Sequence, residues 1–592
     1  MKRLAGYMKN YKKEGILAPA FKLLEAFMDL LVPLVVAAII NQGIAGRDTA
    51  YLIRCFLFLI ALAVLGMLFS FTAQWFAAKA SVGFATELRQ ALFDHIQGLS
   101  YAELDTLGTD TLITRMTSDV NQVQNGLNLA LRLLLRSPFI VFGSMVMVFT
   151  IDVRCALVFT VAIPILSLVV FGIMCASIPL FAKAQTALDR LLGKTRENLT
   201  GVRVIRAFCK EEQEIQEFDE RNEALTRMNE RVGRLSALMN PATYVLINLA
   251  TVFLIREGAV RVHLGAIAQG DVVAMYNYMA QMIVELIKLA SLIITINKSI
   301  ACAKRIEGIL EVESEMKYEK ISVDKTDDGR KEAVCFRRVS FSYKGSGEAA
   351  VTDIDFSVKK GQTVGIIGGT GSGKSTLIQM IPRFYDATEG TVEVNGTDVK
   401  AYPEGELIQK IGIVPQKAVL FEGTIRDNLK WGNEHASDEM LWEALDTAQA
   451  RELAEGKDGQ LDFRIEQNGR NLSGGQKQRL TIARALVKQP EILILDDSAS
   501  ALDFATDLRL RQAIHGLEGD MTVFIVSQRT SSVRGADVIL VLDDGRLVGK
   551  GTHEELLRQC EVYQEIYYSQ FPEERLADKK SGNSVSGEEV LA

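Results

Sequence analysis

Six stretches in the first half of the chain are apolar for long enough to cross a membrane as helices. A bilayer core needs about 20 mostly apolar residues in a helix. Runs such as "FLFLIALAVLGMLFSF" are longer and more apolar than ordinary core helices. The predicted spans cover residues 16–44, 51–79, 127–151, 155–182, 238–262 and 272–300.

Two long polar segments, 80–126 and 183–237, separate these spans, and both keep a helical spacing of apolar residues. With a rise of about 1.5 Å per residue, such helices extend some tens of Å beyond the membrane. A short break in each segment, near 107–110 and near 210–213, lets the chain turn back. These turns are the expected docking points for a cytoplasmic domain.

The pattern changes after residue 303. A charged stretch without aliphatic periodicity is followed from residue 334 by short β-rich runs that alternate with helical patterns, which is typical of an α/β domain. We therefore predict an all-α six-helix transmembrane domain followed by an α/β domain. The sequence "GGTGSGKST" within it predicts that this is an α/β P-loop NTPase domain. The predicted boundaries are 1–311 for the transmembrane domain, 312–333 for a linker, 334–570 for the α/β domain and 571–592 for a disordered tail.

Loop charge gives the orientation. The basic N-terminal residues and the two long segments are rich in Lys and Arg, whereas the other loops are short, so both termini and the α/β domain are expected in the cytoplasm of a multi-pass cell (plasma) membrane protein. The basic N-terminus resembles a signal peptide, but charges interrupt the run after it, and we interpret it as the start of a retained helix.

Three of the spans contain polar or ionisable residues, which are costly at membrane depth. They face a protein interior or a wet cavity, or they reach from helix ends toward the interface; the sequence leaves both interpretations open. These residues are Glu25, Asp29, Asn248, Arg256, Glu285 and Lys288.

Composition excludes several other classes. Of the 592 residues, 48% are hydrophobic and 23% charged, which fits a chain whose apolar and charged residues are segregated. The net charge of −7, without a concentrated basic stripe, argues against a nucleic-acid partner. The seven cysteines are scattered, which argues against a zinc site or a disulfide framework.

The sequence "TVGIIGGTGSGKST" carries the strongest chemical signal. A β-rich run leads into a glycine-rich loop that ends in Lys374 and Ser375, which is the P-loop pattern in its strand–loop–helix context. Backbone N–H groups and the following helix N-terminus bind phosphates, Lys374 reaches the outer phosphates and Ser375 binds Mg²⁺. The predicted phosphate-binding residues are Gly368, Gly369, Thr370, Gly371, Ser372, Gly373, Lys374, Ser375 and Thr376.

Two further motifs complete a nucleotide site. In "ILILDDSASALD", an apolar strand delivers Asp496 to the Mg²⁺ shell. "LSGGQ", at 472–476, precedes an amphipathic helix and offers a second phosphate-binding N-terminus. Two such sites in one chain suggest that two chains share nucleotides across an interface.

The order of P-loop, "GIVPQ", "LSGGQ" and "LILDD…SALD" resembles the nucleotide-binding domain of ABC transporters. With six preceding spans, the chain resembles an exporter-type half-transporter with fused permease and ATP-binding domains, a group that includes bacterial multidrug exporters. The resemblance covers about residues 15–570 and includes the cytoplasmic-loop segments 112–124 and 197–208.

The resemblance implies roles for individual residues. Tyr343 would stack on adenine, and Gln416 would sense the γ-phosphate, join the metal shell and contact the membrane domain. Asp503 would lie in a loop at the dimer interface. The residues that would contact ATP bound to the opposite subunit are Ser473, Gly474, Gly475 and Gln476.

Two positions depart from the family. Asp497 replaces the usual glutamate that polarises the attacking water, and Gln528 replaces the usual histidine. Aspartate is one methylene shorter, so its oxygens lie roughly 1.5 Å further back, and a misplacement of about 1 Å can cost on the order of 100-fold in rate. Asp497, Gln528 and Gln416 therefore form a weakened catalytic set, unless Asp497 acts through a second water.

We expect an ATP-driven exporter with Mg²⁺ as cofactor and a drug, lipid or peptide as amphipathic substrate. The chain would supply the slow nucleotide site of a heterodimer with a second half-transporter in a lipid membrane. The alternatives are a homodimeric lipid or peptide exporter and a nucleotide-gated, channel-like or regulatory membrane protein.

Overall fold

The computed structural model describes residues 2–316, 332–517 and 519–574. The chain forms two compact units. The membrane unit contains the chain up to Gln97 together with Thr109–Val312. The nucleotide unit contains Gly98–Gly108 and the chain from Glu313 onward. A short segment from the first long polar extension therefore belongs to the second unit.

The described residues contain six helical segments that are long and apolar enough to cross a membrane, each including one predicted span, so the six-span prediction is confirmed. The segments are Arg3–Ile44, Thr49–Gln97, Thr109–Ile151, Val153–Thr200, Glu211–His263 and Gln269–Leu310. The α-helices of the membrane unit are α1 (Lys2–Ala5), α2 (Lys12–Ala38), α3 (Thr49–Gln97), α5 (Thr109–Thr114), α6 (Val120–Leu133), α7 (Arg136–Ile151), α8 (Val153–Thr200), α9 (Val202–Ala207), α10 (Glu211–Ala237), α11 (Met239–His263) and α12 (Gln269–Leu310).

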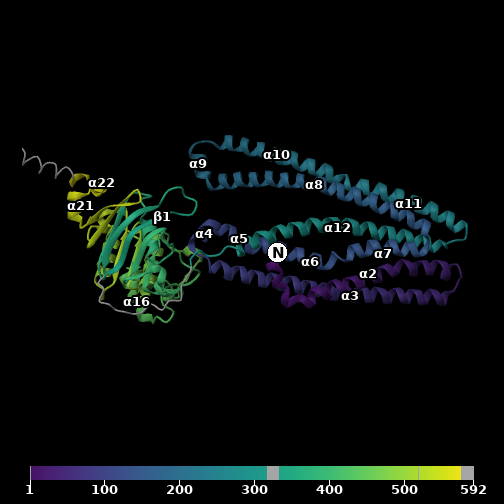
Figure 1. Cartoon of the computed structure of the whole chain (residues 1–592), viewed down its shortest axis with the longest axis horizontal. Coiled ribbons are helices and arrows are strands. Elements are labelled where there is room, and N and C mark those ends of the chain that lie inside the picture. The colour runs from purple at the N-terminus through teal and green to yellow at the C-terminus, as the bar shows by residue number, and fades with distance from the viewer. Residues whose placement is uncertain (1, 317–331, 518, 575–592) are drawn as a thin grey trace, which may run out of the picture. The chain divides into compact units, whose positions relative to one another are not determined.

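The two predicted breaks are present. The first lies at Gly108, between α4 (Tyr101–Leu107) and α5, and the second lies between α9 and α10. Figure 1 shows α8 and α10 running alongside each other. Lys194 on α8 joins them through ion pairs of 2.8 Å to Glu214 and 3.0 Å to Glu217.

The third span contains a break that the apolar pattern does not indicate. Its helix is interrupted at Leu134 and Leu135, between α6 and α7. Pro138 explains the interruption because proline has no N–H to donate to the carbonyl four residues earlier.

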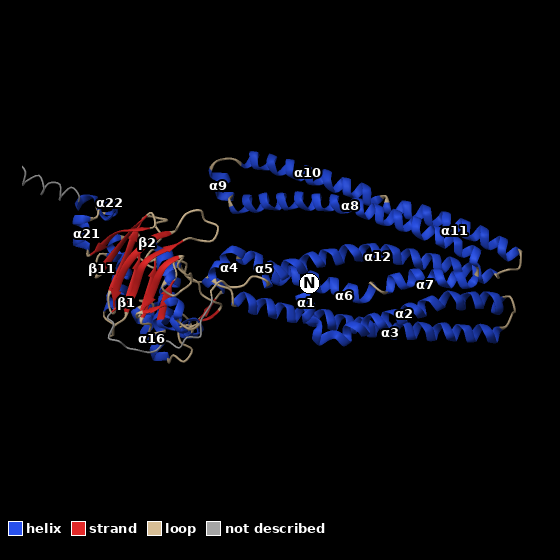
Figure 2. Ribbon diagram, viewed as in Figure 1, coloured by secondary structure: helices blue, strands red, loops and turns tan. Residues whose placement is uncertain are grey.

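The nucleotide unit is an α/β domain, as predicted (Figure 2). Its strands are β1 (Glu332–Phe341), β2 (Val351–Lys359), β3 (Thr363–Gly368), β4 (Glu389–Val394), β5 (Thr397–Asp398), β6 (Ile411–Val414), β7 (Gly423–Thr424), β8 (Arg464–Ile465), β9 (Ile492–Asp496), β10 (Thr522–Val526), β11 (Val538–Asp543) and β12 (Arg546–Gly551). Its helices after α4 are α13 (Lys374–Met380), α14 (Glu406–Lys410), α15 (Ile425–Lys430), α16 (Asp438–Thr447), α17 (Arg451–Glu455), α18 (Gly474–Val487), α19 (Phe504–His515), α20 (Thr530–Val533), α21 (His553–Gln559) and α22 (Glu561–Gln570).

The main sheet has the order β12-β11-β3-β10-β9-β6, and only the β11–β12 pair is antiparallel. Strands β9 and β10 are buried along their whole length, which explains their unbroken apolar runs. Because β3, β6, β9 and β10 are parallel, the loops that follow them meet at one edge of the sheet.

The predicted linker and tail lie partly outside the described residues. Within the linker range, residues 317–331 are outside, and β1 begins at Glu332. Within the tail range, residues 575–592 are outside, while residues 572–574 are helical and the Tyr567 hydroxyl donates a hydrogen bond to Glu574.

Candidate nucleotide-binding site

The glycine-rich loop lies between the carboxyl end of β3 and the start of α13. A Cβ at Gly368 would lie 2.1 Å from the carbonyl oxygen of Leu542, so the neighbouring strand packs too closely for a side chain. Gly373 has a φ of 89°, in the left-handed region that favours glycine. By contrast, a Cβ at Gly369 or Gly371 would meet nothing within 4 Å. The loop therefore presents an open cradle on one side.

Lys374 lies over this loop and is mostly buried. Its ammonium donates hydrogen bonds to the carbonyl oxygens of Gly368 at 3.0 Å and Gly369 at 2.5 Å, and to Ser372 Oγ at 3.3 Å. Burial lowers the pKa of Lys374, and the charges of Asp497 and Asp496 oppose that shift. Three hydrogen bonds thus hold the Lys374 ammonium against the loop.

Asp496 ends β9 and faces the first turn of α13. Its Oδ1 accepts a hydrogen bond of 3.1 Å from Ser375 Oγ. Burial raises the pKa of Asp496, and the neighbouring charge of Asp497 adds to the rise. A hydroxyl and a carboxylate this close provide the hard oxygen ligands that Mg²⁺ prefers, so these two residues fit the predicted metal site.

Asp497 follows at a turn with a φ of 45°, which is uncommon for a residue other than glycine. Its N–H donates to the carbonyl oxygen of Val526 at 3.0 Å, which fixes the turn against β10. Burial raises the pKa of Asp497, while a hydrogen bond with the Gln416 side chain lowers it. The two residues predicted to act on the attacking water and the γ-phosphate thus lie next to each other.

Most of the predicted residues meet in one cavity of about 350 Å³. The predicted residues that line it are Tyr343, Thr370, Gly371, Gly373, Lys374, Ser375, Thr376, Gln416, Asp496, Asp497 and Gln528. Gly368, Gly369 and Ser372 form the loop beneath and contact Lys374. The sheet topology explains most of this meeting, because the P-loop, Gln416, Asp497 and Gln528 follow parallel strands of the main sheet. Tyr343 instead follows β1 of the antiparallel sheet.

The second predicted group does not line this cavity. Ser473 is the N-cap of α18 and accepts a hydrogen bond of 3.4 Å from the N–H of Gln476, whose side chain accepts one of 2.9 Å from the N–H of Ser473. Gln476 is therefore part of a capping box. Asp503 caps α19 by accepting 2.9 Å and 2.8 Å hydrogen bonds from Thr506.

Comparison with known proteins identifies the family. Residues 16–286 match the family model described as the ABC transporter transmembrane region, and residues 351–500 match the model described as ABC transporter. The chain is 35% identical to the ABC transporter ATP-binding protein YfiB of Bacillus subtilis over 97% of this chain and 99% of that protein. It is 34% identical to an ABC transporter ATP-binding protein of Mycobacterium tuberculosis over 96% of this chain and 97% of that protein.

The chain belongs to the ABC transporter family. The structure of a bacterial Atm1-family ABC exporter with ATP bound superposes with a TM-score of 0.78 at 23% identity, covering 94% of this chain and 98% of that one. This ABC transporter is therefore a multi-pass membrane protein that has the exporter fold and fuses a transmembrane domain to an ATP-binding domain.

Three neighbours of the ABC transporter's cavity were not predicted. Ala350, Val526 and Ser527 also line it. Ser527 Oγ accepts a 3.0 Å hydrogen bond from the N–H of Arg529, whose charge lowers the pKa of Asp497. The apolar pattern places β10, but it does not distinguish the polar loop residues that follow.

Helix α4, from the first long extension, is part of the nucleotide unit and packs against residues near its P-loop helix. Tyr101 lies with its ring centroid 4.4 Å from that of Phe384, and the Tyr385 hydroxyl donates a 2.5 Å hydrogen bond to Asp105. Burial, followed by this contact with Asp105, raises the pKa of Tyr385. The aromatic partners of α4 lie shortly after the P-loop helix, so α4 contacts a segment that follows directly from the phosphate-binding loop.

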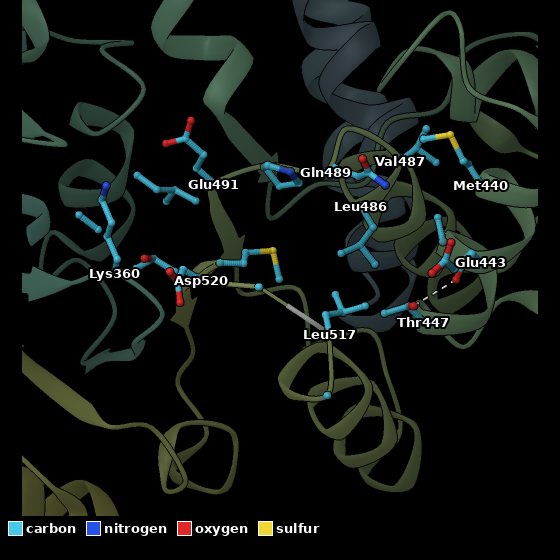
Figure 3. A pocket seen from close by; sticks show the side chains of 18 of the residues that line it. Lys360, Met440, Glu443, Thr447, Leu486, Val487, Gln489, Glu491, Leu517 and Asp520 are labelled. Carbon is cyan, nitrogen blue, oxygen red and sulfur yellow. Dashed lines mark hydrogen bonds between the residues drawn. The ribbon is translucent and has the colours of Figure 1, made fainter. Parts of the chain in front are cut away.

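A larger cavity, of about 820 Å³, lies elsewhere in the nucleotide unit (Figure 3). Its lining includes Lys360, Glu443, Glu491 and Asp520, together with the apolar Leu517. It contains none of the glycine-rich loop or of the motif aspartates. The cavity with the larger volume is therefore not the one that contains the predicted nucleotide-binding residues.

Proposed function

We propose that this chain is the subunit of a heterodimeric ATP-driven exporter that contributes its slow nucleotide site. The observation that carries this proposal is the composition of the 350 Å³ cavity. Its phosphate-binding and metal-binding side chains are complete, whereas Asp497 and Gln528 occupy the positions of the usual glutamate and histidine. The binding groups are present and the hydrolytic groups are weakened.

ATP would be held by the loop amides, Lys374 and Tyr343, and Mg²⁺ by Ser375 and Asp496 with Gln416. When bound, Mg²⁺ neutralises charge that develops on the phosphates. Tyr343 is half-buried at the cavity wall, with its hydroxyl 3.0 Å from Thr376 Oγ1. Its ring packs edge-on against Phe341 and Tyr385, which leaves it supported as a base-stacking platform.

Two features weaken hydrolysis. The Asp497 side chain is one methylene shorter than glutamate, and its turn is fixed by the hydrogen bond to Val526. Little backbone movement is therefore available to recover the reach that a general base needs. Gln528 donates a hydrogen bond but carries no titratable proton, so it cannot exchange a proton with the phosphate as histidine can.

The "LSGGQ" group supports the second half of the proposal. Its serine and glycines lie at the N-terminus of the 14-residue helix α18, away from the chain's own cavity. An N-terminus of this kind binds phosphate. We infer that it completes a fast site on the P-loop of a different half-transporter. The nucleotide unit would lie in the cytoplasm, and ATP-driven closure would export an amphipathic drug, lipid or peptide.

The proposal is tested by restoring the glutamate and the histidine that are usual in the family. Asp497→Glu combined with Gln528→His should raise the ATPase rate of the purified full-length chain by at least about tenfold, given the steep distance dependence of catalysis. An Asp520→Glu variant, in the distant cavity of Figure 3, controls for the added methylene. Phosphate release and nucleotide affinity are measured in parallel.

A rapid ATPase in the unmodified chain alone, stimulated by substrate, would contradict the slow-site assignment and favour a homodimeric exporter. Nucleotide-dependent conductance without ATP-dependent uptake into inverted vesicles would favour a channel-like or regulatory protein instead.

A further inference from the structure

A group of charged side chains connects α2, α7 and α12 inside the predicted spans. Arg136 lies at its centre, 2.7 Å from Glu285 and 3.0 Å from Asp29. Glu285 also accepts a hydrogen bond of 2.7 Å from the Ser137 hydroxyl and one of 3.0 Å from the Lys288 ammonium. Glu25 pairs with Lys22 at 2.5 Å and lies 3.9 Å from Arg136. Three cations thus oppose three carboxylates.

The group divides into a core and an open edge. The side chains of Glu285 and Arg136 are 5% and 12% exposed, whereas those of Asp29 and Lys288 are 42% and 47% exposed. A charge cluster that serves only to hold helices together is best buried completely, because desolvated charges depend on full pairing. Two opposite charges instead remain accessible at membrane depth, where such groups are costly.

These two charges line a cavity of about 350 Å³. Ile140, Ala280 and Val284 supply an apolar wall. Two buried polar atoms of the lining, Gln281 Oε1 and Arg136 Nε, have no hydrogen-bond partner. Both atoms are themselves buried, so they mark a polar wall beside the cavity whose hydrogen-bonding capacity is not filled.

The helix break strengthens this interpretation. Arg136 is the first residue of α7, directly after the interruption at Leu134 and Leu135. Leu134 and Leu135 keep right-handed helical φ and ψ values, so the helix kinks here without unwinding. The chain therefore combines a helix kink, two polar atoms without a hydrogen bond and two partly exposed charges in one place.

We propose that this cavity binds the polar group of an amphiphile that carries a cation and an anion close together. Asp29 contacts the cation, Lys288 contacts the anion, and the apolar wall contacts the chain. Arg136 and Glu285 position these contacts. A ligand with a single charge would leave the balanced group with an uncompensated charge. The claim that this cavity is the substrate site rests on the proposed export function. The claim that it binds such an amphiphile does not depend on that function.

Binding is tested on the full-length protein in a neutral maltoside detergent. The probes are lysophosphatidylethanolamine, lysophosphatidylglycerol and an alkyltrimethylammonium of equal chain length. The zwitterionic probe should bind at least about tenfold more tightly than either singly charged one. Asp29→Asn and Lys288→Gln should each remove most of this preference, whereas Asp29→Glu and Lys288→Arg should keep it. Lys298→Gln, an exposed change on the same helix, is the matched control.

Equal binding of the three probes would overturn the proposal. So would a loss of the zwitterion preference in Lys298→Gln as large as that in Asp29→Asn and Lys288→Gln. Transport assays in vesicles then distinguish two sources of the ligand. ATP-dependent movement of the zwitterionic probe that Lys288→Gln abolishes identifies a substrate site, and binding without movement identifies a site for bilayer lipid. A protein that transports nothing but keeps the binding preference contradicts only the export function.

Discussion

Asp496 and Asp497 are adjacent carboxylates at the end of one strand, and burial raises the pKa of both. For Asp496, the mutual charge adds to the rise, and only the Ser375 hydroxyl and Lys374 oppose it. The site therefore holds a negative charge that the protein alone does not compensate fully. This is the electrostatic state expected of a side chain that awaits a divalent cation.

Asp496→Asn should raise the thermal stability of the nucleotide-free protein at neutral pH. A raised pKa means that the stability associated with Asp496 is fully present below its ordinary value of 3.8 and is lost as the pH rises through the raised value. The advantage of asparagine should thus be largest at neutral pH and shrink toward about pH 4. The unfolding temperature of the nucleotide unit, scanned over pH, is the measurement.

The same variant should lose most of the stabilisation that Mg²⁺-ATP gives, because its metal ligand is gone. Asp503→Ala is the control, and it should lower the stability at neutral pH. The Thr506 N–H lowers the pKa of Asp503, and the capping hydrogen bond stabilises α19. A stability gain for Asp496→Asn that does not depend on pH would contradict the electrostatic explanation.

At the scale of elements, the last helix fixes the loop that carries Gln528. Gln570, at the end of α22, accepts 2.9 Å hydrogen bonds from the N–H and the hydroxyl of Thr530 and donates one of 2.8 Å to the carbonyl of Gln528. Thr530 is fully buried, so its N–H depends on this partner. The helix thereby holds a loop of the nucleotide cavity.

Gln570→Ala should free this loop. The loss of three hydrogen bonds, with a buried donor left unsatisfied, should cost about 1–3 kcal/mol locally. Amide hydrogen exchange at Thr530 should accelerate by roughly tenfold or more, in line with that cost. Exchange in β9 should be unchanged. Ser569→Ala, next to Gln570 and exposed, is the control, and equal acceleration in that variant would rule out a specific role for Gln570.

The sequence predicts some elements and misses others for physical reasons. The six spans and the P-loop follow from local pattern, because length, apolarity and glycine spacing act within a few residues. The α22 contact joins residues some 40 positions apart, and the pairs of Arg136 join residues more than 100 positions apart. No local pattern encodes such partners. Pro138 is a local signal, but the apolar run continues through it, so the pattern predicts an unbroken span where the structure has an interruption.

At the scale of the whole molecule, a heterodimer with one slow site should respond unequally to matching changes. Lys374→Ala removes a charge from the chain's own cavity, whereas under the proposed function a change in "LSGGQ" would affect only a nucleotide bound to the partner. Gly474 is suited to this comparison because a Cβ there would meet nothing within 4 Å. Its substitution should leave the fold of this chain intact.

In a co-expressed heterodimer, Gly474→Asp should lower ATP turnover by at least about tenfold, because it places a negative charge against phosphates that α18 would otherwise stabilise. Gly474→Ala should retain most of the turnover. Lys374→Ala and Asp497→Asn should lower turnover much less than the equivalent changes in the partner, because the slow site supplies little of the total. If Asp497→Asn abolishes turnover while loss of the partner's glutamate does not, the two sites have the opposite assignment, and the shorter carboxylate is the working base.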